Sequence, residues 1–284
     1  MKLLFFVLTF LCLYSCSRFP YSGAIEESAS FLKATYPKSF KSIDYQNEKI
    51  HYLSMGNPRG DLVVFIHGSP GSWKSFANFF KNERLLKQYQ MITFDRFGFN
   101  QNRPGIPHGS LADQIIIPHE IVKHERGGDL SRSVIVVGHS YGGPVAVKYS
   151  LEYAREVSGL VLVAASVDPN LERDLWYQKI GAIWGIRSVI PSFLDVVNRE
   201  IMALKKELVM MDSEYDKLNQ PIYVIHGGLD KLVPKENVTY LQSRISHSKT
   251  AYKTLNNMKH FIPWAFPGLI EDGIQWVSKR IKTD

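Results

Sequence analysis

A serine in the middle of the chain lies between a strand pattern and a helix pattern. The segment 138–142, Gly-His-Ser-Tyr-Gly, follows the β-branched run 134–137 and precedes a stretch with Pro144 that is typical of the start of a helix. Such a junction is a nucleophile elbow, in which a tight turn exposes the serine hydroxyl and the glycines leave room around it. Backbone N–H groups at the helix N-terminus can also stabilise a developing negative charge. The pattern predicts that Ser140 is a nucleophile.

A serine hydroxyl is a good nucleophile only when a base takes its proton and an acidic group orients that base. Two residues follow later predicted strands and could act in this way. Asp230 comes directly after the apolar run 222–226, and His260 comes after the predicted last strand, 251–255. We expect these side chains to meet Ser140 at the carboxyl edge of one sheet.

Other acids and histidines have to be weighed against this pair. Asp168 follows the run 160–163 and is the alternative acid, and His247 is the alternative base, in a polar stretch that places it poorly. His67, His139 and His226 lie in the loops around the predicted site. We expect these three to support the loops and assign them no proton transfer.

Four motifs together resemble the α/β-hydrolase family. They are a turn at 67–71 (His-Gly-Ser-Pro-Gly), a segment at 95–99 (Asp-Arg-Phe-Gly-Phe), the elbow at 138–142 and an acid loop at 228–234. The order serine, acid, histidine is also the chain order of these enzymes. The resemblance extends over roughly residues 40–284 and is much more specific than any one motif.

The resemblance implies a role for each matching position. Ser140 would attack an acyl carbonyl, His260 would act first as base and then as acid, and Asp230 would fix the imidazole tautomer. The backbone N–H groups of Ser69 and Tyr141 would hold the oxyanion. Related haloalkane dehalogenases and epoxide hydrolases carry an aspartate at the nucleophile position, so a serine implies an acyl-enzyme ester instead.

Apolar runs alternate with helical patterns along most of the chain. The runs lie at 50–54, 62–67, 90–95, 134–137, 160–163, 222–226 and 251–255, and helical patterns lie at 26–34, 72–87, from Ser110 onward and at 269–281. Continuous apolar strands that alternate with helices predict an α/β fold with a mostly parallel sheet flanked by helices. We therefore expect an α/β-hydrolase core over residues 41–167 and 219–284.

The segment 168–218 interrupts this alternation because it contains no convincing strand. Its helical patterns carry large apolar side chains: Trp176, Tyr177, Trp184, Phe193, Met202, Leu204, Met210 and Met211. We expect a helical cap over the carboxyl ends of the strands, where open α/β sheets bind ligands. Two ordinary packing helices are the alternative.

The amino terminus has the pattern of a bacterial lipoprotein signal. Residues 1–15 have a short basic start, Met1-Lys2, and continue in an apolar stretch that is too short to span a bilayer. Cys16 would then be lipidated and 16–40 would be a tether. Cleavage after Ser17, or an uncleaved anchor, is the alternative. We expect an extracytoplasmic protein anchored to a bacterial membrane through lipid, or else a secreted or periplasmic one.

Composition limits the partners. The two cysteines are Cys12, in the leader, and Cys16, directly after it. The net charge is +7, and the basic residues are scattered and interleaved with acidic ones. His119 and His124 are five residues apart on one predicted helix, and no carboxylate completes a metal site with them. We expect no metal, no cofactor and no nucleic-acid partner.

The sequence thus predicts a serine hydrolase that cleaves a small-molecule carboxylic ester with an apolar acyl or aryl group, through an acyl-enzyme intermediate. The same triad serves other acyl hydrolases, carbon–carbon bond hydrolases and perhydrolases. A non-catalytic binding lipoprotein is a further alternative, although such proteins usually carry a broken triad.

Overall fold

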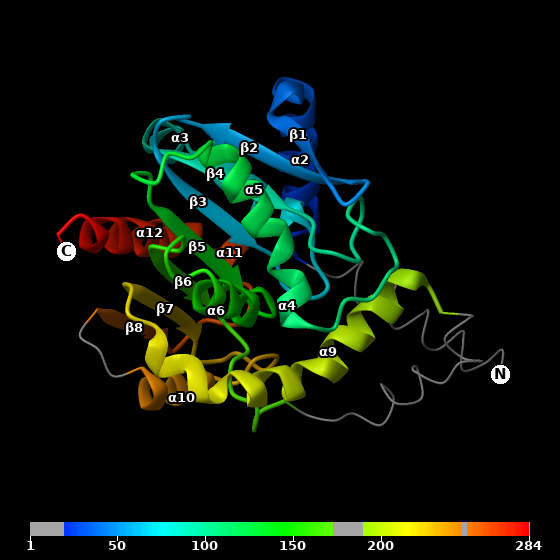
Figure 1. Cartoon of the computed structure of the whole chain (residues 1–284). Coiled ribbons are helices and arrows are strands. Elements are labelled where there is room, and N and C mark those ends of the chain that lie inside the picture. Colours follow the sequence, from blue (N-terminus) through cyan, green and yellow to red (C-terminus); the bar gives the residue numbers. More distant parts are fainter. Residues whose placement is uncertain (1–19, 173–189, 246–248, 284) are drawn as a thin grey trace.

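The computed structural model describes residues 20–172, 190–245 and 249–283. One eight-stranded sheet with the order β1-β2-β4-β3-β5-β6-β7-β8 forms its centre (Figure 1). The strands are β1 (Phe40–Tyr45), β2 (Glu48–Gly56), β3 (Asp61–Ile66), β4 (Tyr89–Phe94), β5 (Val134–His139), β6 (Gly159–Val163), β7 (Ile222–Gly227) and β8 (Thr250–Leu255). The strands from β4 to β8 in this order pair in parallel, and only β1 with β2 and β2 with β4 pair antiparallel. The mostly parallel sheet is confirmed.

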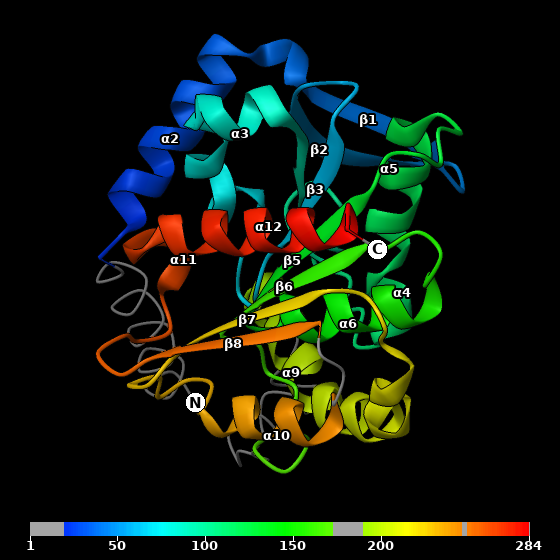
Figure 2. The same ribbon diagram turned by 90° about the vertical axis from the view of Figure 1, so that its left-hand side faces the viewer.

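Helices cover both faces of the sheet. One face carries α4 (Leu111–Gln114), α5 (Ile116–Arg126), α6 (Gly142–Glu152) and α10 (Glu236–Arg244). The other carries α2 (Ser22–Thr35), the 3-10 helix η2 (Trp73–Lys81), α3 (Glu83–Gln88), α11 (Ile262–Ala265) and α12 (Pro267–Ile281). Figure 2 shows α12 lying across this second face.

The central strands are apolar throughout because both of their faces are buried. In β3, Leu62 and Val64 belong to the core under α5 and α6, whereas Val63 and Phe65 belong to the core under η2 and α12. This division follows from the two-residue period of a strand. Each buried side chain of this size contributes about 1.5–3 kcal/mol to folding, so the two cores fix the register of β3.

The predicted helix over 72–87 is divided in two. The Asn82 side chain accepts hydrogen bonds from the backbone N–H groups of Arg84 and Leu85, so it caps α3 and ends η2. Asparagine is a preferred capping residue because its side-chain oxygen satisfies the free N–H groups of the first turn. The helical pattern expected from Ser110 onward begins with α4, and Ser110 caps this helix, since its hydroxyl accepts from the Ala112 N–H.

The first described residues pack on the core. The helix α2 is longer than the expected 26–34, and its Ala29 and Leu32 are buried against η2. The short 3-10 helix η1 (Pro37–Ser39) then leads into β1, an edge strand that the sequence did not predict. The leader and Cys16 lie outside the described residues. Within the described part of the chain, no helix is both long and apolar enough to cross a membrane.

A long helix, α9 (Ser192–Met211), lies between β6 and β7 in the sequence and is followed by η3 (Asp212–Lys217). Its buried face repeats at about every fourth residue and consists of Asp195, Val196, Glu200, Leu204, Leu208 and Met211. Val196 packs against Gly98, in the loop that follows β4. This part of the predicted cap therefore packs on the loops at the carboxyl ends of the strands. Trp176, Tyr177 and Trp184 lie outside the described residues, and the cap boundaries stay a prediction.

Candidate active site

Ser140 occupies a tight turn between β5 and α6. Its φ is +55°, a left-handed conformation that non-glycine residues seldom adopt. Two hydrogen bonds hold the turn: the Ser140 N–H donates to the Val163 carbonyl at 3.0 Å, and the Gly143 N–H donates to the Ser140 carbonyl at 2.9 Å. The strained strand–turn–helix junction is the geometry that an exposed nucleophile requires.

Gly142 is required at this turn because β3 passes very close to it. A Cβ placed on Gly142 would lie 2.2 Å from the Ile66 carbonyl oxygen, which is backbone and cannot move aside.

We expect Gly142→Ala to lower Tm by several degrees, since overpacking costs about 1–3 kcal/mol and each kcal/mol lowers Tm by about 2–4 °C. Gly268→Ala is the control, because nothing lies within 4 Å of a Cβ there. Thermal unfolding followed by circular dichroism checks both, and an unchanged Tm for Gly142→Ala would contradict the packing.

The predicted acid and base are paired in the structure. His260 Nδ1 lies 2.7 Å from Asp230 Oδ2, and both side chains are buried. The other carboxylate oxygen accepts the backbone N–H groups of Leu232 and Val233, each at 2.9 Å. Burial acts to raise the pKa of Asp230, but the hydrogen bonds from His260 and these N–H groups outweigh it and lower the pKa. An ionised carboxylate can only accept hydrogen bonds, so His260 Nδ1 must carry the imidazole proton and donate a hydrogen bond to Asp230. The other ring nitrogen, Nε2, is then unprotonated and can act as a base.

Asp168, the alternative acid, has different partners. Its Oδ1 accepts the backbone N–H of Asn170 at 2.9 Å and the Asn170 side-chain amide at 3.1 Å. Its own N–H donates to the side-chain oxygen of Asn237. Asp168 thus shapes the loop after β6, and the acid whose carboxylate meets His260 is Asp230. His247 lies outside the described residues.

Three buried histidines hold the loops around this pair. His139 Nε2 lies 3.2 Å from the His260 carbonyl, and His226 Nε2 lies 3.0 Å from the Val233 carbonyl, so in both rings Nε2 must donate. In His67, Nε2 accepts the Arg96 N–H at 2.9 Å, which leaves Nδ1 to donate to the Gly68 carbonyl at 2.8 Å. These contacts match the supporting roles expected for the three residues.

Burial lowers the pKa of all three supporting histidines. In His139, burial and the nearby His260 and His226 outweigh the hydrogen bond to the His260 carbonyl and the charge of Asp230, and together they lower the pKa to about 3. An unfolded histidine binds a proton below about pH 6.5, but the folded His139 does not until about pH 3. The unfolded state therefore gains protons that the folded state lacks, and stability falls as the pH drops below about 6.5.

We expect the free energy of unfolding to fall by up to about 1.4 kcal/mol per pH unit for each such histidine between pH 6.5 and 5. Urea unfolding at several pH values measures the slope. His139→Gln keeps a side-chain N–H donor for the His260 carbonyl and removes the titration, so its slope should be shallower. An equal slope in the variant would assign the pH dependence to other groups.

The turn at 67–71 lies directly beside the serine. A Cβ on Gly68 would lie 3.0 Å from Ser140 Cβ and 3.5 Å from Ser140 Oγ, so a side chain at this position would press directly on the serine. Ser69 follows, joined to Pro70 by a cis peptide bond. The structure thus brings Ser69, one of the two predicted oxyanion residues, to the side of Ser140, and Tyr141 follows the serine in the turn.

A cavity of about 530 Å³ opens above these residues. Its lining includes the polar residues Ser69, Ser140, Tyr141, Ser166, Glu172, Lys231 and His260 and the apolar residues Pro70, Leu171, Ile201, Leu204, Leu232, Val233 and Pro234. The carboxyl group of Glu172 accepts a hydrogen bond from the Ser166 hydroxyl, and burial raises its pKa. The serine and the histidine therefore face one cavity that α9 helps to line. Of the apolar cap residues predicted from sequence, Leu204 lines it, whereas Phe193, Met202 and Met210 are exposed.

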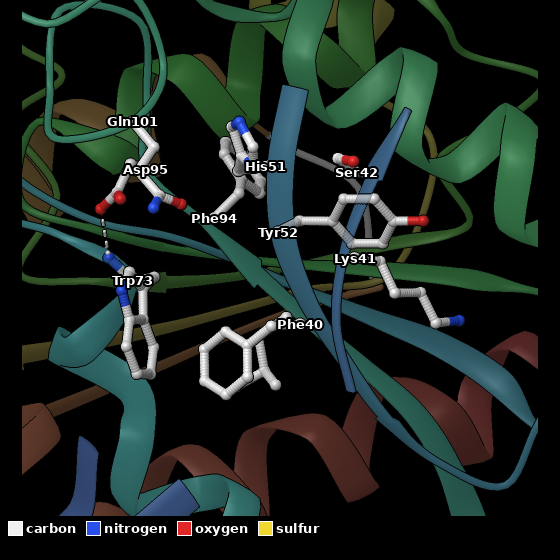
Figure 3. A pocket seen from close by; sticks show the side chains of 10 residues that line it. Phe40, Lys41, Ser42, His51, Tyr52, Trp73, Phe94, Asp95 and Gln101 are labelled. Atoms are coloured by element: carbon white, nitrogen blue, oxygen red, sulfur yellow. Dashed lines mark hydrogen bonds between the residues drawn. The ribbon is translucent and has the colours of Figure 1, made fainter. Parts of the chain in front are cut away.

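A second cavity of about 280 Å³ is lined by residues of β1, β2 and β4, with Trp73 and the loop after β4 (Figure 3). Asp95 lines it, and the Trp73 N–H donates to Asp95 Oδ1 at 2.9 Å. Asn100 donates to the same oxygen, so Asp95 ties the start of η2 to the loop after β4. Neither Ser140 nor His260 is among its lining residues, and both line the cavity of about 530 Å³ instead.

Sequence reasoning overlooked one part of this site. Glu200 on α9 forms a fully buried ion pair with Arg96 and also accepts a hydrogen bond from Ser69. The motif at 95–99 includes Arg96, but its partner is far away in the chain. The only available signal was a glutamate on the otherwise apolar stripe of Val196, Leu204 and Leu208.

Comparison with known proteins agrees with this architecture. Residues 61–185 match the family model described as the alpha/beta hydrolase fold. The chain is 28% identical over 285 residues to Lipase 1 of Psychrobacter immobilis, and the match covers 87% of this chain and 88% of that protein.

Solved structures show the same fold at low sequence identity. One is the 2-hydroxy-6-oxo-6-phenylhexa-2,4-dienoate hydrolase of Rhodococcus sp. strain RHA1, with a TM-score of 0.65, 16% identity and coverage of 84% of this chain and 98% of that one. Another is the monoacylglycerol lipase of Paleococcus ferrophilus, with a TM-score of 0.64, 14% identity and coverage of 83% and 99%. The chain has the α/β-hydrolase fold.

Proposed function

We propose that this enzyme with the α/β-hydrolase fold is a serine hydrolase that cleaves a carboxylic ester through an acyl-enzyme intermediate. The observation that carries the proposal is the pairing of His260 with Asp230 in the cavity that exposes Ser140. The likeness to Lipase 1 of Psychrobacter immobilis over most of both chains supports ester hydrolysis as the reaction.

Each step follows from the chain's own groups. His260 Nε2 takes the hydroxyl proton as Ser140 Oγ attacks the ester carbonyl, and Asp230 stabilises the imidazolium that forms. The negative charge on the carbonyl oxygen is held by the backbone N–H groups of Ser69 and Tyr141, each worth about 10²–10³ in rate. His260 then gives its proton to the leaving alcohol. Water attacks the acyl-enzyme with His260 again as the base. The bond to Ser140 Oγ then breaks, His260 returns the proton to that oxygen, and the carboxylic acid leaves.

The cavity wall favours an apolar group next to the scissile bond. Its apolar lining includes the aliphatic residues Leu171, Ile201, Leu204, Leu232 and Val233. Aliphatic walls of this kind bind a group by the apolar area that it buries, at about 25 cal/mol per Å². We propose a short or medium acyl chain, or an aryl group, as the part of the substrate that these residues bind.

A panel of p-nitrophenyl esters of graded acyl length, tested on residues 20–284 after removal of the leader, examines the proposal. We expect turnover with a maximum of kcat/KM at one chain length, together with labelling of Ser140 by a fluorophosphonate probe. Labelling without turnover of any ester would show a reactive serine but refute ester hydrolysis, and the substrate would then be another acyl compound or one with a scissile carbon–carbon bond. If the folded protein shows neither labelling nor turnover, the chain is a binding protein.

We further propose that Cys16 carries lipid and anchors the enzyme on the outer side of a bacterial membrane. The apolar stretch before Leu13-Tyr14-Ser15-Cys16 supports this proposal. Mass spectrometry of the native amino terminus tests it. A diacylglyceryl-modified Cys16 is the expected result, and a free amino terminus at Arg18 would refute it.

A further inference from the structure

A fully buried ion pair connects α9 to the loop after β4. Arg96 Nη1 lies 2.5 Å from Glu200 Oε1, and Arg96 Nη2 lies 3.0 Å from Glu200 Oε2, so the pair is bidentate. Neither side chain is exposed to solvent. Buried charges are costly to desolvate, and such a pair persists only with good geometry and further hydrogen bonds. The other contacts of both side chains therefore show what the pair holds in place.

The guanidinium of Arg96 reaches the turn beside the nucleophile. Nε donates to the His67 carbonyl at 3.0 Å, and Nη2 donates to the Gly68 carbonyl at 3.1 Å. The guanidinium carbon also lies 4.6 Å from the ring centre of Tyr141, within the range of a cation–π contact. The two residues proposed to donate to the oxyanion are Ser69 and Tyr141. Arg96 thus contacts the backbone just before Ser69 and the side chain of Tyr141.

Glu200 completes the arrangement from the opposite side. Its Oε2 accepts the Ser69 hydroxyl at 2.7 Å, and its Oε1 accepts the Gln114 side-chain amide at 2.9 Å. Each carboxylate oxygen therefore accepts two hydrogen bonds. Because Ser69 is held by its own side chain, the orientation of its peptide depends on where Glu200 lies. Glu200 belongs to α9, so the position of this helix sets the position of the turn.

We propose that Glu200 and Arg96 are positioning residues for the oxyanion hole, and that α9 must be docked through this pair for turnover. The inference rests on the proposed serine-hydrolase function. Neither residue lines the cavity that contains Ser140, so neither contacts substrate. They act through Ser69, Gly68 and Tyr141. The oxyanion hole is therefore complete only when α9, which lies outside the alternating strands and helices of the core, places the carboxylate of Glu200 beside Ser69.

Glu200→Gln tests this arrangement because it keeps the shape of the side chain and removes the charge that Arg96 needs. We expect kcat to fall by about 10- to 100-fold and KM to change by less than about twofold, since the change affects donors that act in the transition state. The rate of fluorophosphonate labelling should fall by a similar factor, because the phosphoryl oxygen occupies the same donors.

Glu207→Gln is the matched control on the same helix. Glu207 Oε2 accepts the Leu111 N–H at 2.9 Å, so this residue also ties α9 to the core, but it has no hydrogen bond to the turn at 67–71. We expect kcat and the labelling rate to stay within about twofold of the wild type. If Glu207→Gln lowers kcat as much as Glu200→Gln, docking of α9 in general is responsible and the specific role of Glu200 is overturned.

Ser69→Ala keeps the test decisive if Glu200→Gln does not fold. It removes only the hydroxyl that contacts Glu200 and leaves the backbone N–H. We expect kcat to fall by about three- to tenfold with KM unchanged and the fold retained, and no further loss of kcat when it is combined with Glu200→Gln. Wild-type kcat in Ser69→Ala, and in Glu200→Gln where it folds, would overturn the proposal. A wild-type enzyme that neither labels nor hydrolyses esters would instead refute the function itself.

Discussion

Replacement of Ser140 by alanine should lower kcat for ester hydrolysis by about 10⁶-fold and abolish fluorophosphonate labelling. Ser140 is the hydroxyl held at a φ of +55° beside Gly68, in the cavity that also contains His260. Without it, His260 has no nucleophile to deprotonate. What remains is the rate that substrate binding and the oxyanion donors provide, about 10³–10⁴ above water.

Ser166→Ala is the matched control for this experiment. Ser166 lines the same cavity, but its hydroxyl donates to Glu172, and it lies in the loop after β6 rather than in the elbow. We expect its kcat to stay within about tenfold of the wild type and its labelling to persist. The Tm of Ser140→Ala should match that of the wild type, which separates lost chemistry from lost folding. Equal labelling of Ser140→Ala would show that another residue is the nucleophile.

The central sheet was predictable because its strands are buried on both faces. β3, β5, β6 and β7 are continuous apolar runs, and each was located within one or two residues of its actual bounds. The edge strand β1 escaped prediction for the opposite reason. Its burial alternates between intermediate and exposed, and residues such as Lys41, Ser42 and Asp44 do not form an apolar run. Its pairing with β2, and not its own composition, makes it a strand.

The residues that meet at the candidate site could also be located from sequence, since they lie in short motifs. The elbow, the turn at 67–71 and the loop with Asp230 each occur within seven consecutive residues or fewer. The link between Arg96 and Glu200 spans 104 residues, and no local pattern connects the two. A long-range pair of this kind depends on how α9 packs on the sheet, which periodicity alone does not determine.

The sequence favours Asp230 over Asp168 only through the resemblance of 228–234 to an acid loop. β6 and β7 are parallel neighbours, so both acids follow strands that end at the same edge of the sheet. Strand order therefore does not separate them, and the loop conformations do. The loop after β7 turns Asp230 toward His260, and the loop after β6 turns Asp168 toward Asn170.

Asp230→Asn should therefore lower kcat by about 10⁴-fold while it preserves the shape of the loop. The backbone N–H groups of Leu232 and Val233 both require an acceptor at the Oδ1 position. The amide oxygen of asparagine must take that position, which turns its NH₂ group toward His260 Nδ1. A donor at this position forces Nδ1 to accept, so the imidazole proton moves to Nε2. His260 can then no longer take the proton of Ser140.

Asp168→Asn provides the comparison, because an asparagine oxygen can still accept the hydrogen bonds from Asn170. We expect its kcat to stay within about threefold of the wild type. Steady-state kinetics with the best ester of the panel measures both variants, and KM should change little in either. A large loss in Asp168→Asn alone would assign the acid to the loop after β6. Equal losses in both would mean that the substitutions disturb the shared sheet edge and not the tautomer of His260.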